Sequence, residues 1–181
     1  MSEKDDNELV YEVIRGSISS FEVLIDRYQK TIFNMVLKMV GDVETAKDIT
    51  QDVFVKVFEK MGSFNFKYRF FSWIYRIALN QTLNYLKSNP RKEELKKAEA
   101  LPADENGEQR TERGSLLLHQ GLRELPADYR VLLLLKYFCS MSYEEISETM
   151  EIPVKKVRSR LFMAREQLNR VMVAKGFFDN D

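Results

Sequence analysis

The feature that most constrains the fold is a regular three- and four-residue spacing of apolar residues along much of the chain. Between residues 21 and 39 this spacing joins Phe21, Leu24, Ile25, Tyr28, Ile32, Met35 and Met39. Residues spaced in this way lie on one stripe of an α-helix. The 181 residues include only seven Gly and four Pro, fewer turn residues than sheets and hairpins need. The sequence therefore predicts an all-α fold.

Capping residues divide the first part of this pattern into separate helices. Ser19 or Ser20 can cap a helix that ends at Gly41, the position expected for a left-handed C-cap. Asp42 can then cap a second helix. A third helix is expected from about Phe70 to Lys87, after the break at residues 62–63.

Residues 61–92 contain six basic residues, eight aromatic residues and no Asp or Glu, although the formal net charge of the chain is zero. Proteins bind single-stranded nucleic acid with aromatic rings that stack on bases, at about 1–3 kcal/mol per base, and with a cationic groove that follows the phosphates. A buried aromatic helix with a solvated basic rim would have the same composition. Composition alone leaves both interpretations open.

A polar stretch follows the third helix. Residues 89–114 contain almost no large apolar side chains, so they cannot bury enough surface to offset their chain entropy. We therefore expect two small helical domains, residues 1–88 and 115–181, joined by a flexible polar linker over residues 89–114.

The second of these domains contains the sharpest local motif. Ser142 and Glu145 have the spacing of a capping box, which begins a short helix. Pro153 begins another, whose apolar residues repeat at helical spacing and whose remaining face is basic. This pattern predicts a helix-turn-helix, whose second helix enters the major groove of DNA. The alternative is an ordinary helical hairpin with a charged surface.

Other classes of protein are disfavoured. No run of 18 apolar residues is present, and the acidic N-terminus does not read as a secretory signal. With one cysteine, Cys139, a reducing cytoplasm is the expected location. His119 lies in a Leu-rich stretch and Cys139 beside an apolar run, so both are interpreted as structural. We expect no enzyme activity, no cofactor and no metal site.

Three segments carry a resemblance to a known family. They are residues 48–54 (DITQDVF), residues 71–80 (FSWIYRIALN), and Leu125-Pro126 followed by residues 157–161 (VRSRL). In this order, and with a polar linker between them, they resemble the bacterial RNA polymerase sigma factors of the extracytoplasmic-function group. The resemblance extends from about Val10 to Met172. It implies a transcription initiation factor that binds core RNA polymerase, reads the −35 promoter element and melts the −10 element.

The resemblance also assigns roles to residues. Four residues would face the clamp helices of the polymerase β′ subunit, namely Asp48, Gln51, Asp52 and Val55. The −10 element would be contacted by Phe64, Lys67, Tyr68, Arg69, Ser72, Trp73, Tyr75, Arg76, Asn80 and Asn84. The −35 element would be contacted by Lys155, Lys156, Arg158, Ser159, Arg160, Phe162 and Arg165.

The implied partners are the β and β′ subunits of core polymerase, promoter DNA and an anti-sigma factor, with no small-molecule substrate. A membrane-bound anti-sigma factor would hold the chain at the inner face of the membrane. The main alternative is a helix-turn-helix regulator with a helical sensing domain. It explains the second domain but gives no reason for the acid-free aromatic stretch.

Overall fold

The computed structural model describes residues 4–89, 117–118 and 120–176, and their regular structure is helical, with no strand among them. The all-α prediction is confirmed. Most of the predicted linker, residues 90–114, and His119 lie outside the described residues.

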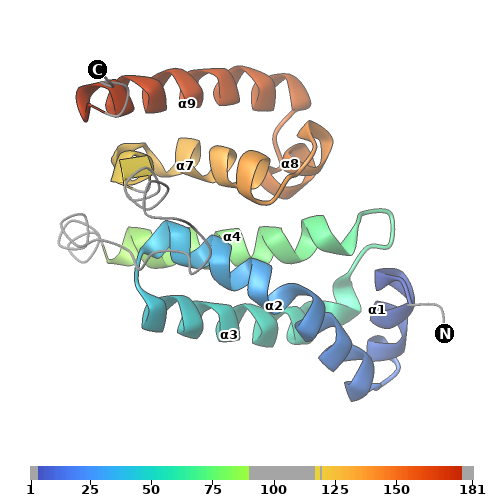
Figure 1. The fold of residues 1–181 in the computed structure, drawn as a ribbon. Coiled ribbons are helices and arrows are strands. Elements are labelled where there is room, and N and C mark those ends of the chain that lie inside the picture. Colours follow the sequence, from blue (N-terminus) through green and yellow to red (C-terminus); the bar gives the residue numbers. More distant parts are fainter. Residues whose placement is uncertain (1–3, 90–116, 119, 177–181) are drawn as a thin grey trace.

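The first half consists of α1 (Asp6–Ile14), α2 (Ile18–Val40), α3 (Val43–Lys60), a 3₁₀ turn (Met61–Ser63) and α4 (Phe70–Ser88). The second half contains helical residues 117–118 and 120–124, then α7 (Ala127–Leu133), a π-helical segment (Leu134–Phe138), α8 (Tyr143–Met150) and α9 (Val154–Ala174). Figure 1 shows α7 and α8 lying between α4 and α9, so that the two halves form one stack of helices.

The predicted caps are largely confirmed. Gly41 ends α2 in the left-handed region at φ 70°, and its N–H donates to the carbonyl of Leu37. Asp42 accepts from the N–H of Thr45 at the start of α3. The start of α2 was predicted wrongly: its N-cap is Ser17, not Ser19 or Ser20.

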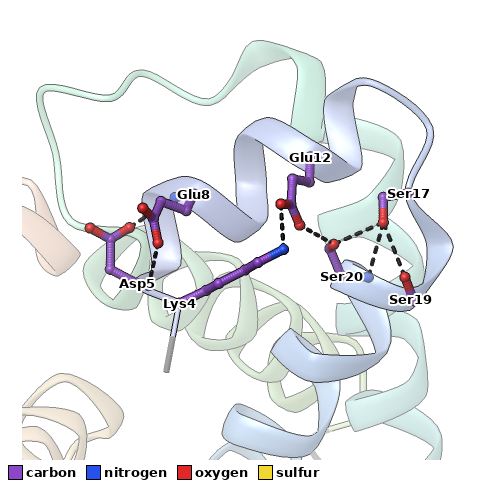
Figure 2. A network of polar contacts seen from close by, with 7 residues as sticks. All are labelled: Lys4, Asp5, Glu8, Glu12, Ser17, Ser19 and Ser20. Atoms are coloured by element: carbon purple, nitrogen blue, oxygen red, sulfur yellow. Dashed lines mark hydrogen bonds and ion pairs between the residues drawn. The ribbon is translucent and has the colours of Figure 1, made fainter. Parts of the chain in front are cut away.

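The first helix, α1, was not predicted, and a polar network ties it to α2 (Figure 2). The Glu12 carboxylate accepts from Lys4 Nζ and from Ser20 Oγ, each at 2.5 Å. These two hydrogen bonds hold the pKa of Glu12 below its ordinary value. Because Ser20 is turned toward Glu12 and Ser17, it is not available as the helix cap. The same network therefore explains why Ser20 is not the N-cap of α2.

The buried apolar residues of both halves form one connected cluster. In the first half α2 packs against α1, α3 and α4, and in the second half α7 and α8 pack against α9. The halves meet where α8 packs against α4. The predicted domain boundaries stay a prediction, but the two sets of helices share a substantial interface in this arrangement.

A buried arginine joins the second half to the end of α2. Arg130 of α7 is only 2% exposed, and its Nη1 donates to the carbonyl of Met39 at 3.1 Å. Its remaining nitrogens donate to the carbonyls of Leu122, Arg123 and Leu125. The last carbonyls of a helix lack partners within the helix and carry its negative dipole end. A buried guanidinium therefore satisfies this end of α2 and fixes the second half to it.

We predict that Gly41→Ala destabilises the protein. A left-handed backbone costs a residue with a Cβ about 1–2 kcal/mol, and a Cβ here would lie 1.3 Å from Arg123 Nη2. For a chain of this size each kcal/mol lowers Tm by roughly 2–4 °C, which calorimetry can measure. Gly62→Ala is the control, because nothing lies within 4 Å of its added Cβ. Equal Tm values for the two variants would contradict the packing of Arg123 on Gly41.

Candidate nucleic-acid interface

The outer face of α3 brings together the four residues predicted to bind polymerase. Asp48, Gln51, Asp52 and Val55 are all exposed, and their three- and four-residue spacing puts them on one side of the helix. Two carboxylates and an apolar side chain that is 58% exposed make this face both acidic and partly apolar. Such a face is suited to a basic amphipathic helix.

A groove of about 670 Å³ lies between α2 and α3, beside this face. Its apolar lining is Ile18, Phe21, Ile25, Phe54, Val55 and Phe58. The rings of Phe21 and Phe58 lie 5.0 Å apart, and Ile18 and Phe58 are exposed. Phe58 was missed from the sequence, although it comes three residues after Val55 and continues the same edge of the helix.

The loop before α4 holds a cluster of aromatic rings. Phe64 packs against Phe66, Phe70 and Trp73, with ring centroids 5.1 to 5.7 Å apart. Phe64 is buried, whereas Phe66 is 46% and Tyr68 47% exposed. The expectation that Phe64 itself contacts DNA does not fit this placement, because its ring faces the other aromatic rings. Phe66 and Tyr68 are the rings of this loop that lie open to solvent, and Phe66 is not among the individual residues predicted from the sequence.

The other predicted −10 residues divide by exposure. The exposed ones are Lys67, Tyr68, Arg69, Asn80 and Asn84. Trp73 and Arg76 are half-buried, and Ser72 and Tyr75 are buried. Direct contact of Ser72 or Tyr75 with DNA does not fit the present arrangement of the helices.

The second half is packed over part of α4. Arg76 Nη1 donates to Glu151 Oε1 and its Nη2 to the carbonyl of Glu148, both at 2.7 Å. Ser72 lies one turn before Arg76 on the same side of the helix and is 0% exposed. Tyr75 contacts Cys139, which precedes α8. Arg76, Ser72 and Tyr75 therefore face the second half, whereas Trp73 packs against Phe64 and Phe70 of the first half.

The predicted helix-turn-helix is formed by α8 and α9. Ser142 accepts from the N–H of Glu145, and the Glu145 carboxylate accepts from the N–H of Ser142, which confirms the capping box. Glu151 ends α8 in the left-handed region at φ 54°, a conformation that costs a non-glycine residue about 1–2 kcal/mol. Pro153 then precedes the first turn of α9. The two helices pack on each other as the motif requires.

The outward side of α9 carries the predicted −35 residues. Exposed residues on this helix include Lys155, Lys156, Arg158, Ser159, Phe162 and Arg165, and Arg160 is half-buried. The guanidinium of Arg158 lies 5.5 Å from the ring centroid of Tyr143, which limits the directions in which this side chain extends. Arg165 donates to the hydroxyl of Tyr137 at 3.2 Å. The result is a basic helical surface that also exposes two neighbouring apolar side chains, Phe162 and Met163.

Two groups near the contact between the halves have shifted pKa values. Burial opposes ionisation of Glu145, but hydrogen bonds from Ser142 and Arg69 outweigh it and hold the pKa of this carboxyl below its ordinary value. The carboxylate is therefore charged at neutral pH. Burial raises the pKa of the Cys139 thiol to about 11, and a hydrogen bond with Tyr75 partly opposes this. Cys139 is therefore a neutral and poorly nucleophilic thiol at pH 7.

Within residues 4–89, 117–118 and 120–176, no three His, Cys, Asp or Glu side chains are grouped as metal ligands. In the same part of the chain, none of the helices has both the length and the apolar character that crossing a bilayer requires.

Family models match both halves. A model described as Sigma-70 region 2 matches residues 24–92, and one described as Sigma-70, region 4 matches residues 115–168. The chain is similar to the RNA polymerase sigma-H factor of Pseudomonas aeruginosa, with 32% identity over 95% of this chain and 96% of that protein. It is also similar to the ECF RNA polymerase sigma-E factor of Escherichia coli K12, with 35% identity over 93% and 95%.

Two solved structures share the fold. CnrH, in complex with the cytosolic domain of CnrY, has a TM-score of 0.73 and 22% identity over 93% of this chain and 97% of that one. The sigma factor RpoE of Bartonella quintana, in complex with the anti-sigma factor NepR, has a TM-score of 0.68 and 18% identity over 86% and 98%. At these identities the likeness concerns the fold.

Proposed function

The chain belongs to the extracytoplasmic-function group of sigma-70 factors and directs RNA polymerase to promoters, and we propose that its two halves divide this task. Residues 1–88 would bind core polymerase and open the −10 element, and residues 115–181 would read the −35 element. The observation that carries this proposal is that the exposed acidic face of α3, the aromatic loop before α4 and the basic face of α9 are three separate surfaces with different chemistry.

The α3 face is proposed as the contact with polymerase. Asp48 and Asp52 supply negative charge, Val55 supplies apolar surface, and the adjoining groove offers a concave apolar seat between α2 and α3. A helix of the β′ subunit with basic and apolar side chains fits such a seat. Complementary charges also raise the rate of association.

The loop before α4 is proposed as the contact with the melted −10 strand. Phe66 and Tyr68 present exposed rings on which bases can stack, and Lys67 and Arg69 supply nearby positive charge for phosphates. Taking a base out of the duplex costs a few kcal/mol. Two stacking rings, at about 1–3 kcal/mol each, offset a cost of this size.

The second half is proposed as the reader of the −35 element. Arg158 is the candidate for a bidentate contact with guanine, which discriminates against other bases by about 1–3 kcal/mol. Lys155, Lys156 and Arg165 are candidates for phosphate contacts. The activity that we propose is binding and not catalysis.

An anti-sigma factor is a further proposed partner. The related folds of CnrH and the Bartonella RpoE are each complexed with another protein, in the second case named as an anti-sigma factor. A protein that covers the α2–α3 groove would compete with polymerase for the same apolar side chains. A helix-turn-helix regulator without sigma activity would not account for the match of residues 24–92 to sigma region 2.

We predict that Asp52→Lys weakens binding to core polymerase. Reversing one charge at a charged interface costs at least about 1.4 kcal/mol, which is tenfold in Kd. The measurement is a titration of labelled chain with core polymerase in the absence of DNA. Glu166→Lys makes the same charge change on exposed α9 and should leave Kd within about twofold, well under 1 kcal/mol. An unchanged Kd for Asp52→Lys would exclude this face of α3 from the polymerase contact.

We predict that Arg158→Ala and Lys156→Ala affect DNA binding differently. Loss of a base contact should relax sequence preference at one −35 position, at about 1–3 kcal/mol, whereas loss of a phosphate contact should weaken all sequences alike and reduce the salt slope by about one. Holoenzyme affinity for a set of −35 variants at several salt concentrations separates the two. If Arg158→Ala kept the wild-type preference at every position, Arg158 would not be the base contact.

A further inference from the structure

Arg158, the proposed base contact of α9, lies beside an aromatic ring from α8. Its guanidinium carbon is 5.5 Å from the ring centroid of Tyr143. Tyr143 is the first residue of α8 and Arg158 is the fifth of α9, so the contact joins the two helices of the helix-turn-helix. A guanidinium over an aromatic face is attracted by the quadrupole of the ring. The contact therefore favours one placement of an exposed side chain that would otherwise have many.

This contact orients Arg158 without using its hydrogen-bond donors. Arg69 and Arg76 donate to carboxylates, and the buried Arg130 donates to backbone carbonyls. Arg158, in contrast, forms neither a hydrogen bond nor an ion pair with any residue that the structure describes. A guanidinium carries five N–H donors in a fixed planar fork, and attraction to a ring face leaves these donors at the edge of the fork. Arg158 therefore keeps its full set of donors for an acceptor outside the chain.

The half-buried ring of Tyr143 is itself held in two ways. Tyr143 directly follows Ser142, whose side chain accepts from the Glu145 N–H while the Glu145 carboxylate accepts from the Ser142 N–H. This capping box fixes the backbone that carries the ring. Lys136 Nζ lies 4.7 Å from the centroid of the same ring and donates to the carbonyl of Met141 at 3.0 Å. The support for Arg158 is therefore anchored to the start of α8 and to the segment before it.

A second pair of a tyrosine and an arginine on α9 has different chemistry. Arg165 follows Arg158 by seven residues, about two turns further along the same side of the helix. Its Nη1 donates to the hydroxyl of Tyr137 at 3.2 Å, so one of its donors is already in use. The N-terminal residues of a recognition helix are the ones that meet base edges. Arg158 therefore has both the position and the free donors for a base, whereas Arg165 is better suited to a phosphate.

From these contacts we propose that Tyr143 is a positioning residue for recognition of the −35 element. Its ring presets the Arg158 fork for the O6 and N7 acceptors of guanine. The side chain has then lost part of its rotamer freedom before DNA arrives, so less entropy is lost when the contact forms. The gain applies to the correct base, because only there does the fork find both acceptors. This inference rests on the proposed use of Arg158 as the −35 base contact.

The test measures base preference, the ratio of holoenzyme Kd values for promoters that differ at one −35 position. A loss of folded chain or of polymerase binding weakens every promoter alike and leaves this ratio unchanged. Tyr143→Leu removes the ring but keeps an apolar side chain of high helix propensity, and Tyr143→Phe keeps the ring and removes only the hydroxyl. Tyr137→Leu is the matched control, because it removes an exposed ring beside the other arginine, Arg165.

The position that Arg158 reads is the one at which Arg158→Ala relaxes the preference. At that position we expect Tyr143→Leu to reduce the preference about two- to fivefold, the size of an exposed cation–π contact. Tyr143→Phe should keep the wild-type preference, because the ring and not the hydroxyl holds the guanidinium, and Tyr137→Leu should keep it too. A wild-type preference in Tyr143→Leu, or a loss in Tyr143→Phe equal to that in Tyr143→Leu, would overturn the inference.

A double variant separates failure of this inference from failure of the proposed function. In the Arg158→Ala background, Tyr143→Leu should cause no further loss of preference, because the ring then has no guanidinium to hold. A further loss would show that Tyr143 acts on DNA by itself and would overturn the positioning role. If Arg158→Ala relaxes one position and Tyr143→Leu does not, the inference alone fails. If Arg158→Ala relaxes no position, the proposed base contact fails and the positioning role with it.

Discussion

The arrangement of the whole molecule depends on how the C-terminal end of α2 is satisfied. Arg130, from the second half, is buried and donates to the Met39 carbonyl while three carbonyls of its own half hold the rest of its guanidinium. Leaving such a group or its acceptors unpaired in the interior costs several kcal/mol. The two halves are therefore held together by a buried cation at a helix end, and the surface ion pairs of Arg69 with Glu145 and of Arg76 with Glu151 add to this contact.

In this arrangement α8 has two roles. Its capping box fixes the start of the helix that supports α9, and the same Glu145 carboxylate also accepts from Arg69 of the first half. The proposed −35 reader and the covered face of α4 are thus linked through one short helix. The second half does not cover the outer face of α3 or its groove. Both remain open to a partner while the two halves are packed together. This face of α3 is therefore available to polymerase while the two halves are packed together.

Local signals in the sequence were enough to predict Gly41, Asp42 and the Ser142 capping box, because each depends on residues within one turn. They did not predict α1, a nine-residue helix with only three buried residues, Leu9, Val10 and Val13, which is too short for a clear helical repeat. Nor could they place the buried rings: Phe64 and Phe66 look alike in the sequence, and only packing against Phe70 and Trp73 decides which is hidden. Pairs such as Arg76 and Glu151, 75 residues apart, depend on the docking of the halves and leave no trace in helical periodicity.

The two halves pack together in the free chain but have to lie apart on a promoter, because the −10 and −35 elements are about 25 base pairs, or about 85 Å of B-DNA, apart. The most direct measurement is the distance between spin labels by double electron–electron resonance, with labels at Glu44 on α3 and Glu166 on α9 in a Cys139→Ser background. The free chain should give one narrow short distance, and promoter-bound holoenzyme a distance longer by tens of ångströms, as element spacing of about 85 Å requires. The same distance in both states would show that the halves do not separate on a promoter, and a broad distribution in the free chain would show that they are not packed together there.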